Sequence, residues 1–405
     1  MADNKDKKVL NVPALRFPEF NGEWITRPIK DIADFIGGGT PSSANEAYWQ
    51  GTIPWVSSSD IVEDNINDIT ISRYITEEAI SNSATKLCSA PVILIVSRVG
   101  VGKVALSSKA ICTSQDFCNL INIKVHPTFL AYSLSQIMKR KSIEVQGTSI
   151  KGITSLEIQK IILHIPSLQE QHKISDLFQL IDKRIAVQSK IIEKYESLIQ
   201  AMCDTLIGKE EQQVMLSFNE FGQSYSGLSG KSADDFGEGY PYITYMNVYQ
   251  NQIIDSTDIG LVKINETEQQ SVVRYGDILL TLSSETPEEV GMGAVYLGET
   301  YPMYLNSFCF GIHITDESKI YPPFLTYYVS SQLFRKTVYP LAQGSTRFNL
   351  QKNDFMKKKF SFPVIEKQRQ TYSILKNYSD KLIVEKQIMR LLCNQKCYLL
   401  RQLFI

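Results

Sequence analysis

Two short runs come closest to a catalytic or phosphate-binding motif: residues 37–42, which read Gly-Gly-Gly-Thr-Pro-Ser, and residues 98–104. A P-loop requires Gly-x-x-x-x-Gly-Lys followed by Ser or Thr, because its backbone amides cradle phosphates that the lysine also reaches. The first run has no lysine. In the second, Ser97 stands in place of the first glycine and Val104 in place of the hydroxyl residue. Neither run therefore predicts nucleotide hydrolysis.

The cysteines and histidines are scattered along the chain, with no C-x-x-C pair and no H-E-x-x-H sequence. Metal centres and thiol redox sites need such close spacing. We therefore expect no metal site and no catalytic residue, and we interpret the seven cysteines as reduced residues in a cytoplasmic protein. No apolar run reaches the roughly 18 to 20 residues of a membrane span.

The composition instead favours a binding protein. Several predicted loops combine small polar residues with an aromatic residue or an isolated cation. Arg, Asn and Gln read base edges in DNA, whereas Ser, Thr and Lys commonly contact phosphates. The candidate DNA-binding residues in the first half are Gly39, Thr40, Ser42, Trp55, Ser58, Ser59, Arg98, Gln115, Thr148 and Ser149. Those in the second half are Tyr245, Asn247, Ser283, Ser284, Asn306, Thr346 and Arg347.

Taken singly, each of these segments is better explained as an ordinary turn, because Gly and Ser favour turn conformations. Their parallel placement in the two halves of the chain supports the binding interpretation.

An internal repeat indicates that the loops of the two halves are attached to similar structural elements. Residues 147–171 align without a gap with residues 344–368, at an offset of 197 positions. The aligned residue types match at the start, middle and end of the segment. The matching pairs are Gly147 with Gly344, Pro166 with Pro363, and Gln171 with Gln368.

After each of these prolines comes a run of about forty residues without glycine or proline, until Gly208 in the first copy and the chain end in the second. In both runs apolar residues recur at alternating spacings of three and four. That spacing is typical of a coiled coil. The alternative is an amphipathic helix on a globular core, but such helices average roughly 11 to 12 residues. Two matched long helices in one chain are therefore expected to pair with each other as an antiparallel coiled coil.

A strand-rich domain precedes each predicted helix, so the fold class is α+β with two tandem domains and pseudo-two-fold symmetry. The expected strands are residues 52–56, 92–97, 120–125, 240–245, 277–282 and 308–314, and the expected short helices are residues 129–141 and 323–336. We divide the chain into an N-terminal polar segment (1–16), a first domain (17–148), a spacer with a long helix (149–208), a second domain (209–345) and a second spacer with a long helix (346–405).

Charge is sorted by segment, although the whole chain has a formal net charge of only −1. Residues 212–345 contain six basic and fifteen acidic residues, whereas residues 346–405 contain thirteen basic and four acidic residues. A near-neutral total therefore does not exclude a basic surface.

These features together resemble one known family. Trp24, residues 36–42, Ile53-Pro54-Trp55-Val56 and the segment from Gly147 to Gln171 resemble the target-recognition domain and spacer helix of type I restriction–modification specificity subunits. The resemblance covers essentially the whole chain. In the second half it departs from the pattern, because Tyr225-Ser226-Gly227 replaces the triple glycine.

The resemblance implies a non-catalytic subunit with two target-recognition domains, reading an asymmetric bipartite target in double-stranded DNA. It implies two methyltransferase subunits and restriction/translocase subunits as partners. S-adenosylmethionine, ATP and Mg²⁺ would be bound by those partners, and no cofactor by this chain. The alternative from another class is a coiled-coil scaffold that binds proteins through its two domains without binding DNA.

The repeat also suggests a mechanism. A helix of about 38 residues rises roughly 57 Å at 1.5 Å per residue, which limits the separation of two half-sites to about 17 base pairs. The helix pair would then set the spacing between half-sites. Its exposed cations, Lys183, Arg184, Lys190 and Lys194, are expected to contact partner subunits.

Overall fold

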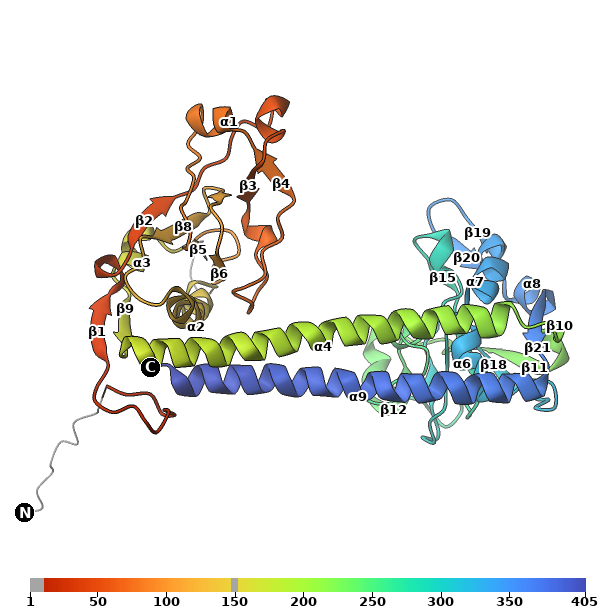
Figure 1. Cartoon of the computed structure of the whole chain (residues 1–405). Coiled ribbons are helices and arrows are strands. Elements are labelled where there is room, and N and C mark those ends of the chain that lie inside the picture. The colour runs from red at the N-terminus through yellow and green to blue at the C-terminus, as the bar shows by residue number, and fades with distance from the viewer. Residues whose placement is uncertain (1–10, 147–151) are drawn as a thin grey trace, which may run out of the picture. The chain divides into compact units, whose positions relative to one another are not determined.

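The computed structural model describes residues 11–146 and 152–405 (Figure 1). The chain divides into two compact units. Unit 1 contains the described residues up to Ser189 together with Ile388–Ile405, and unit 2 contains Lys190–Gln387. Each unit therefore combines one globular domain with a part of both long helices.

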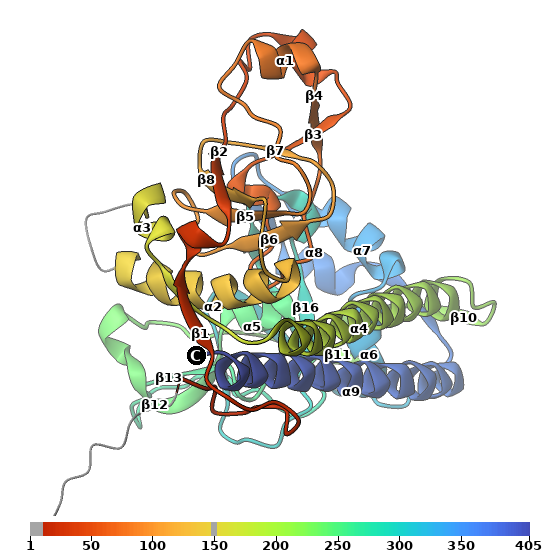
Figure 2. The ribbon, with the colours of Figure 1, turned by 60° about the vertical axis from the view of Figure 1, so that its left-hand side comes forward.

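The core of unit 1 lies on both faces of a four-stranded antiparallel sheet with the order β2-β8-β5-β6. All five residues of β5 are buried, because α2 covers one face of the sheet and a second sheet, β4-β3-β7, adjoins the other (Figure 2). A third pair, β1 with β9, lies next to the long helix. These elements are β1 (Ile25–Pro28), β2 (Asp34–Gly37), β3 (Ile53–Val56), β4 (Arg73–Ile75), α1 (Glu77–Ser81), β5 (Val92–Val96), β6 (Val104–Ser107), β7 (Cys112–Thr113), β8 (Phe117–Ile121), α2 (Pro127–Gln146), α3 (Ser155–Gln159) and β9 (Ile162–Ile165).

Unit 2 repeats this topology. Its four-stranded sheet has the order β11-β18-β14-β16, its three-stranded sheet has the order β13-β12-β17, and β10 pairs with β21. An additional small sheet, β15-β20-β19, has no counterpart in the described part of unit 1. The elements are β10 (Gln213–Ser217), β11 (Gly222–Ser226), β12 (Phe236–Ile243), α5 (Tyr245–Gln250), β13 (Ile259–Val262), β14 (Ile278–Thr281), β15 (Ser283–Ser284), β16 (Gly293–Val295), β17 (Tyr304–Leu305), β18 (Cys309–Ile314), α6 (Leu325–Tyr328), α7 (Gln332–Val338), β19 (Ala342–Gln343), β20 (Phe348–Leu350), α8 (Lys352–Lys357) and β21 (Lys359–Pro363). The prediction of two versions of one fold is confirmed.

The two long helices are α4 (Leu168–Gly208) and α9 (Ile365–Leu403), and their first residues are separated by the 197 positions of the sequence repeat. They pack in antiparallel orientation within each unit. In unit 1 Asp182 contacts Lys396, and in unit 2 Glu196 contacts Lys386. The predicted antiparallel helix pair is thus confirmed.

The aligned glutamines, Gln171 and Gln368, join each long helix to its domain by the same pair of hydrogen bonds. Each side chain accepts from the backbone N–H just before the domain helices, at 2.9 Å in both units. Each also donates to the carbonyl of the proline before the long helix, at 2.9 Å in unit 1 and 2.8 Å in unit 2. Both glutamines are buried, so the sequence match reflects a shared structural role.

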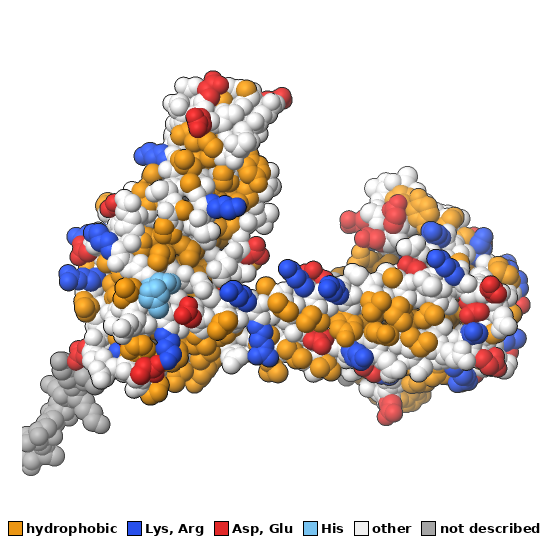
Figure 3. All heavy atoms as spheres, in the orientation of Figure 1, with side chains coloured by type: hydrophobic (Ala, Val, Ile, Leu, Met, Phe, Trp, Pro, Cys, Tyr) orange, Lys and Arg blue, Asp and Glu red, His pale blue; other side chains and the backbone are white. Residues whose placement is uncertain are grey.

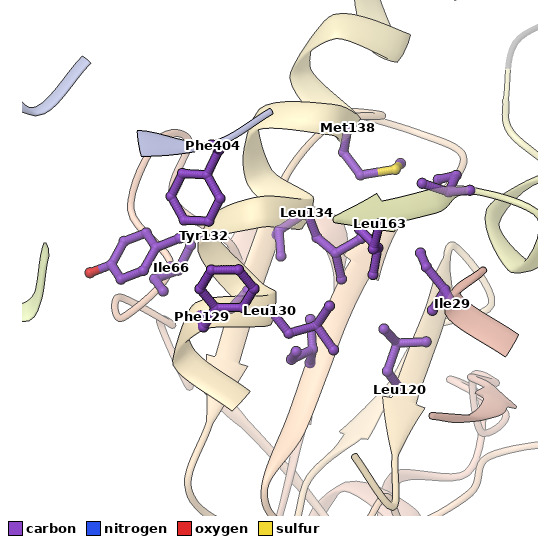
Figure 4. Close-up of a cluster of buried hydrophobic side chains, with 14 of the residues drawn as sticks. Ile29, Ile66, Leu120, Phe129, Leu130, Tyr132, Leu134, Met138, Leu163 and Phe404 are labelled. Atoms are coloured by element: carbon purple, nitrogen blue, oxygen red, sulfur yellow. The ribbon is translucent and has the colours of Figure 1, made fainter. Parts of the chain in front are cut away.

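The C-terminal end of each long helix packs into the core of the other repeat's domain: α9 into the first domain and α4 into the second. Phe404 packs against Phe129 of α2, with ring centroids 5.3 Å apart (Figure 4). It also packs against Phe178 of α4, with ring centroids 5.9 Å apart. In unit 2 the equivalent residue, Ile207, is fully buried in the core around β14 and β18. Each domain core is therefore completed by the other repeat.

Two predicted elements differ from the structure. The strand expected at 120–125 is β8, which ends at Ile121 because Asn122 has a positive φ of 51°. The helix expected at 323–336 is split into α6 and α7, because Ser331 caps a new helix by accepting the backbone N–H of Phe334.

Candidate nucleic-acid interface

Unit 1 has a cleft of about 660 Å³ at one edge of its four-stranded sheet, where β2 and β5 end and β8 begins. It brings together two candidates that are distant in sequence, Arg98 and Gln115, and both side chains are exposed. The lining residues are Gly37, Gly38, Ser97, Arg98, Val99, Gln115, Asp116, Phe117, Cys118, Gly152, Ile153, Thr154 and Ser155.

Close backbone packing explains the glycines of this edge. A Cβ added to Gly38 would lie 2.0 Å from the carbonyl oxygen of Ser114, and one added to Gly39 would lie 2.4 Å from the backbone of Ala84. The N–H of Gly39 also donates to the carbonyl of Thr113, at 2.8 Å. Gly38 and Gly39 therefore allow a close approach of backbone segments, whereas a Cβ at Gly37 would meet no atom within 4 Å.

The hydroxyl of Thr40 donates to the side-chain carbonyl of Gln115 at 2.5 Å, and both residues are exposed. This bond fixes the orientation of the Gln115 amide, so that its NH₂ group is the part able to donate to a base edge. Thr40 thereby positions Gln115 beside Arg98 at the mouth of the cleft.

The ring of Trp55 is buried and makes its contacts within the fold. It is 3% exposed, its indole N–H donates to the carbonyl of Gly39 at 2.9 Å, and the guanidinium of Arg73 lies 4.4 Å from its ring centroid. Arg73 in turn pairs with Asp60 at 2.7 Å. The indole of Trp55 thus holds the glycine-rich run in place, and a direct contact of Trp55 with DNA stays a prediction.

The remaining candidates of the first half lie on nearby loops. Ser42 and Ser59 are exposed, and Ser58 is half-buried. The carbonyl of Ser58 accepts a hydrogen bond from the ammonium group of Lys103 at 3.3 Å. Thr148 and Ser149 lie outside the described residues.

Four candidates of the second half are brought together in unit 2. Ser283 and Ser284 form β15 and pair with Asn349 and Phe348 of β20, directly after the exposed Arg347. The hydroxyl of Tyr245 donates to the carbonyl of Ser283 at 2.8 Å. Burial raises the pKa of Tyr245, so its phenol remains protonated at neutral pH. Ser283 and Ser284 are each only 7% exposed, so their hydroxyls offer little surface to a ligand.

Asn247 and Asn306 both make hydrogen bonds within loops of unit 2. Asn247 is completely buried, and its amide donates to the carbonyls of Asp255 and Asp258 at 2.8 and 2.5 Å. The half-buried Asn306 accepts the N–H of Phe308 at 2.9 Å. The bonds of Asn247 direct its side chain into the fold, and base reading by these two residues stays a prediction. Thr346, in contrast, is exposed beside Arg347.

The shared topology shows which positions correspond. The N–H of Ile153 donates to the carbonyl of Ser97, and the N–H of Leu350 donates to that of Leu282, both at 2.8 Å. Arg98 therefore corresponds to Ser283, and the two units place different side chains at the same strand end.

The correspondence also reveals Lys352, a residue that sequence reasoning missed. It aligns with Ser155 of the unit 1 cleft, and its ammonium group donates to the hydroxyl of Ser226 at 3.2 Å. The repeat alignment contained the signal, because Ser155 and Lys352 are 197 positions apart. At this edge of the four-stranded sheet, the first domain thus carries a cation, Arg98, after the end of β5. The second domain carries one, Lys352, at the start of α8.

Both long helices carry exposed side chains, cations on α4 and apolar residues on α9. Lys183, Arg184, Lys190 and Lys194 are all exposed. On α9 Val384, Leu391 and Tyr398 recur at intervals of seven and are 52%, 65% and 60% exposed. Figure 3 shows basic and apolar side chains alternating along the visible part of the helices. Such a mixed surface is suited to a protein partner.

The described residues give little support to a metal site, a membrane span or a reactive thiol. Among residues 11–146 and 152–405 there is no group of His, Cys, Asp or Glu arranged to hold a metal ion. Nor does that part of the chain contain a helix long and apolar enough to cross a membrane. The buried thiols are unreactive, as burial raises the pKa of Cys88 to about 11 and that of Cys309 to about 12.

Comparison with known proteins identifies the family of both domains. Residues 21–197 and 220–392 each match the type I restriction modification DNA specificity domain. The MjaIX specificity subunit of Methanocaldococcus jannaschii is 32% identical over 42% of this chain, and the EcoR124I/EcoR124II specificity subunit of Escherichia coli is 28% identical over 46%. The chain spans 41% and 50% of those two relatives. The MjaVIII specificity subunit of M. jannaschii is 21% identical over 95% of this chain and 92% of its own length.

Two solved structures share the fold. The type I restriction–modification S subunit of M. genitalium superposes with a TM-score of 0.56 at 18% identity, covering 97% of this chain and 99% of its own. A chain from a study of complex assembly in a type I R-M system has a TM-score of 0.59 at 14% identity and covers 93% and 96%. With both of its domains matched, this chain belongs to the family of type I restriction–modification DNA specificity subunits.

Proposed function

We propose that this chain reads an asymmetric bipartite DNA target, one half-site with each domain. The observation that supports this most strongly is the pairing of equal topology with unequal side chains. Arg98 and Ser283 occupy the same strand end, as do Ser155 and Lys352 at the neighbouring helix start. A common scaffold presents equivalent loops to duplex DNA, whereas different side chains select different bases.

The helix pair in this proposal sets the spacing between the half-sites. α4 and α9 each supply helix to both units, and they are 41 and 39 residues long. Long helices are stiff compared with loops, so their length fixes how many base pairs are left unread between the half-sites.

We assign the exposed helix face to two methyltransferase subunits, with restriction/translocase subunits joining the complex through them. Leu180 and Val187 on α4 are 64% and 57% exposed and lie among the exposed cations. Apolar residues surrounded by charges are typical of a protein interface. In this proposal S-adenosylmethionine, ATP and Mg²⁺ are bound by those partners, and this non-catalytic chain acts with them in the cytoplasm.

The test is a binding experiment with the complex of this chain and its methyltransferase subunits. The complex is titrated onto duplexes from the host genome that carry its methylated motif, at several salt concentrations. Specific binding should depend on both half-sequences and weaken steeply with salt, since phosphate contacts release counterions. Replacing one domain by that of another family member should change one half of the target only.

The same experiment discriminates the scaffold alternative. A complex that assembles with methyltransferase subunits but shows the same weak affinity for all duplexes would contradict DNA reading by this chain. A double variant, Leu180→Asp with Val187→Asp, tests the helix face separately. It should prevent assembly with the methyltransferase while the chain itself stays folded, because both side chains are exposed.

A further inference from the structure

Unit 1 contains a buried ion pair between its two long helices. The ammonium group of Lys396 on α9 lies 2.7 Å from a carboxylate oxygen of Asp182 on α4, and each side chain is 10% exposed. Lys396 also donates to the carbonyl of Asp64 at 2.9 Å. Asp182 accepts the hydroxyl of Tyr132 at 2.5 Å and the amide of Asn67 at 2.8 Å.

The ion pair joins the two helices, whereas the other three hydrogen bonds hold each charged group against the first domain. A buried charge that keeps its opposite partner is tolerated, whereas a buried charge that loses its partner is strongly destabilising. Single buried polar residues fix partner choice in coiled coils for the same reason. The Asp182–Lys396 pair therefore favours α9 over a second α4 as the partner of α4.

Unit 2 shows an uncharged alternative at the same place. The repeat carries Asp182 to Ser379 and Lys396 to Ile199. The hydroxyl of Tyr327 donates to Ser379 at 2.9 Å, as that of Tyr132 does to Asp182. Ile199 is half-buried and brings no charge.

We propose that the Asp182–Lys396 pair is a partner-selection device, by which each long helix pairs with the other and is prevented from pairing with the same helix of a second copy. Antiparallel pairing of α4 with another α4 would place Asp182 against Ile199. Pairing of α9 with another α9 would place Lys396 against Ser379. Both arrangements leave one buried charge without its partner. The two unlike domains of one chain are thereby assembled with each other and not with those of a second copy.

The mismatched pairs can be built within the intact chain. Lys396→Ile creates the Asp–Ile combination of an α4–α4 pair. Asp182→Ser creates the Ser–Lys combination of an α9–α9 pair. The double variant creates the Ser–Ile combination that unit 2 already contains. Each single variant should lower the folding equilibrium constant of unit 1 by about 100-fold or more, and the double variant should regain most of that loss.

Tryptophan fluorescence measures this selectively, because all three tryptophans, at positions 24, 49 and 55, belong to unit 1. Urea unfolding of the full chain is followed for the four proteins. If a single variant yields no folded protein while the double variant folds, the proposal is equally supported. Singles that match the wild type, or a double variant that is as damaged as the two losses combined, would overturn it.

The matched control is the ion pair of Lys386 with Glu196, which joins the same two helices at 2.7 Å but is 54% and 49% exposed. Lys386→Ile, Glu196→Ser and their combination should each leave the urea midpoint nearly unchanged, because exposed pairs contribute little. Both series are compared by circular dichroism, because this pair lies in unit 2 and the tryptophans report on unit 1. A control series as sensitive as the buried series would show that any charge on this interface matters, which contradicts selection by the buried pair.

Discussion

At the scale of single residues, exposure distinguishes contact residues from positioning residues. Arg98 and Gln115 are exposed at the mouth of one cleft. Trp55 and Asn247 have suitable chemistry for DNA binding but are buried and fully engaged within the fold. Residue type and loop context are visible in the sequence. The direction of a side chain is not, since it depends on contacts with distant residues such as Gly39 and Asp258.

Arg98→Ala should relax sequence preference at one position of one half-site. The loss of a bidentate base contact is expected to cost about 1–3 kcal/mol there and little elsewhere. Affinities of the methyltransferase complex for a panel of single-base target variants give the measurement. Arg140→Ala, an exposed cation on α2 that lies outside the cleft, is the control. Equal weakening on every target would make Arg98 a phosphate contact.

Unit 1 should lose stability as the pH falls below about 6.5. Burial and the adjacent His172 lower the pKa of His126, and burial lowers that of His164. A lowered pKa of a base means that the folded state binds fewer protons than the unfolded state. The stabilising contribution is therefore complete above the usual histidine pKa and decreases as the pH falls through the lower folded value.

Urea midpoints from tryptophan fluorescence at pH 7.5 and 5.5 check this. His126→Gln should reduce the difference between the two midpoints, because the glutamine side chain does not titrate. In unit 2 the position equivalent to His126 is Tyr321, whose ring centroid lies 4.5 Å from the guanidinium carbon of Arg369. An identical pH dependence in wild type and variant would show that His126 is not responsible.

At the scale of elements, the repeat was the most productive sequence feature. It predicted both long helices and the equivalence of the glutamines that join them to their domains. The division of residues 323–336 into α6 and α7 could not be predicted from periodicity, because it rests on a side-chain cap by Ser331. The pairing of β1 with β9 and of β10 with β21 joins strands far apart in sequence, for which the chain carries no local signal.

Gln171→Ala and Gln368→Ala should destabilise units 1 and 2 respectively by about 1–3 kcal/mol each, because buried backbone groups lose their partners. Tryptophan fluorescence should detect the first variant, whereas circular dichroism should detect both. Gln200→Ala, at an exposed position of α4, serves as the control. A loss of stability in unit 1 caused by Gln368→Ala would contradict the local role of each glutamine.

At the scale of the whole molecule, the proposed spacing function depends on both helices having matched lengths. One heptad inserted after Ser189 in α4 and after the equivalent Lys386 in α9 lengthens each by roughly 10 Å. The half-sites should then move apart by about three base pairs while both half-sequences stay the same. Selection of targets from a library with random spacing measures the change.

A seven-residue Gly/Ser insertion between Glu266 and Thr267, at an exposed turn of unit 2, is the control and should leave the spacing unchanged. Unaltered half-site spacing in the helix-extended protein would exclude the helices as the element that sets it.

The contact of Phe404 with Phe178 has a consequence for synthesis. These residues lie 226 positions apart in one core, so the first domain emerges from the ribosome long before its core can close. The core of unit 2 needs Ile207, which precedes that domain in the chain and is already present when the domain is made. Since domains fold as their residues become available, the half that is made second is expected to fold first.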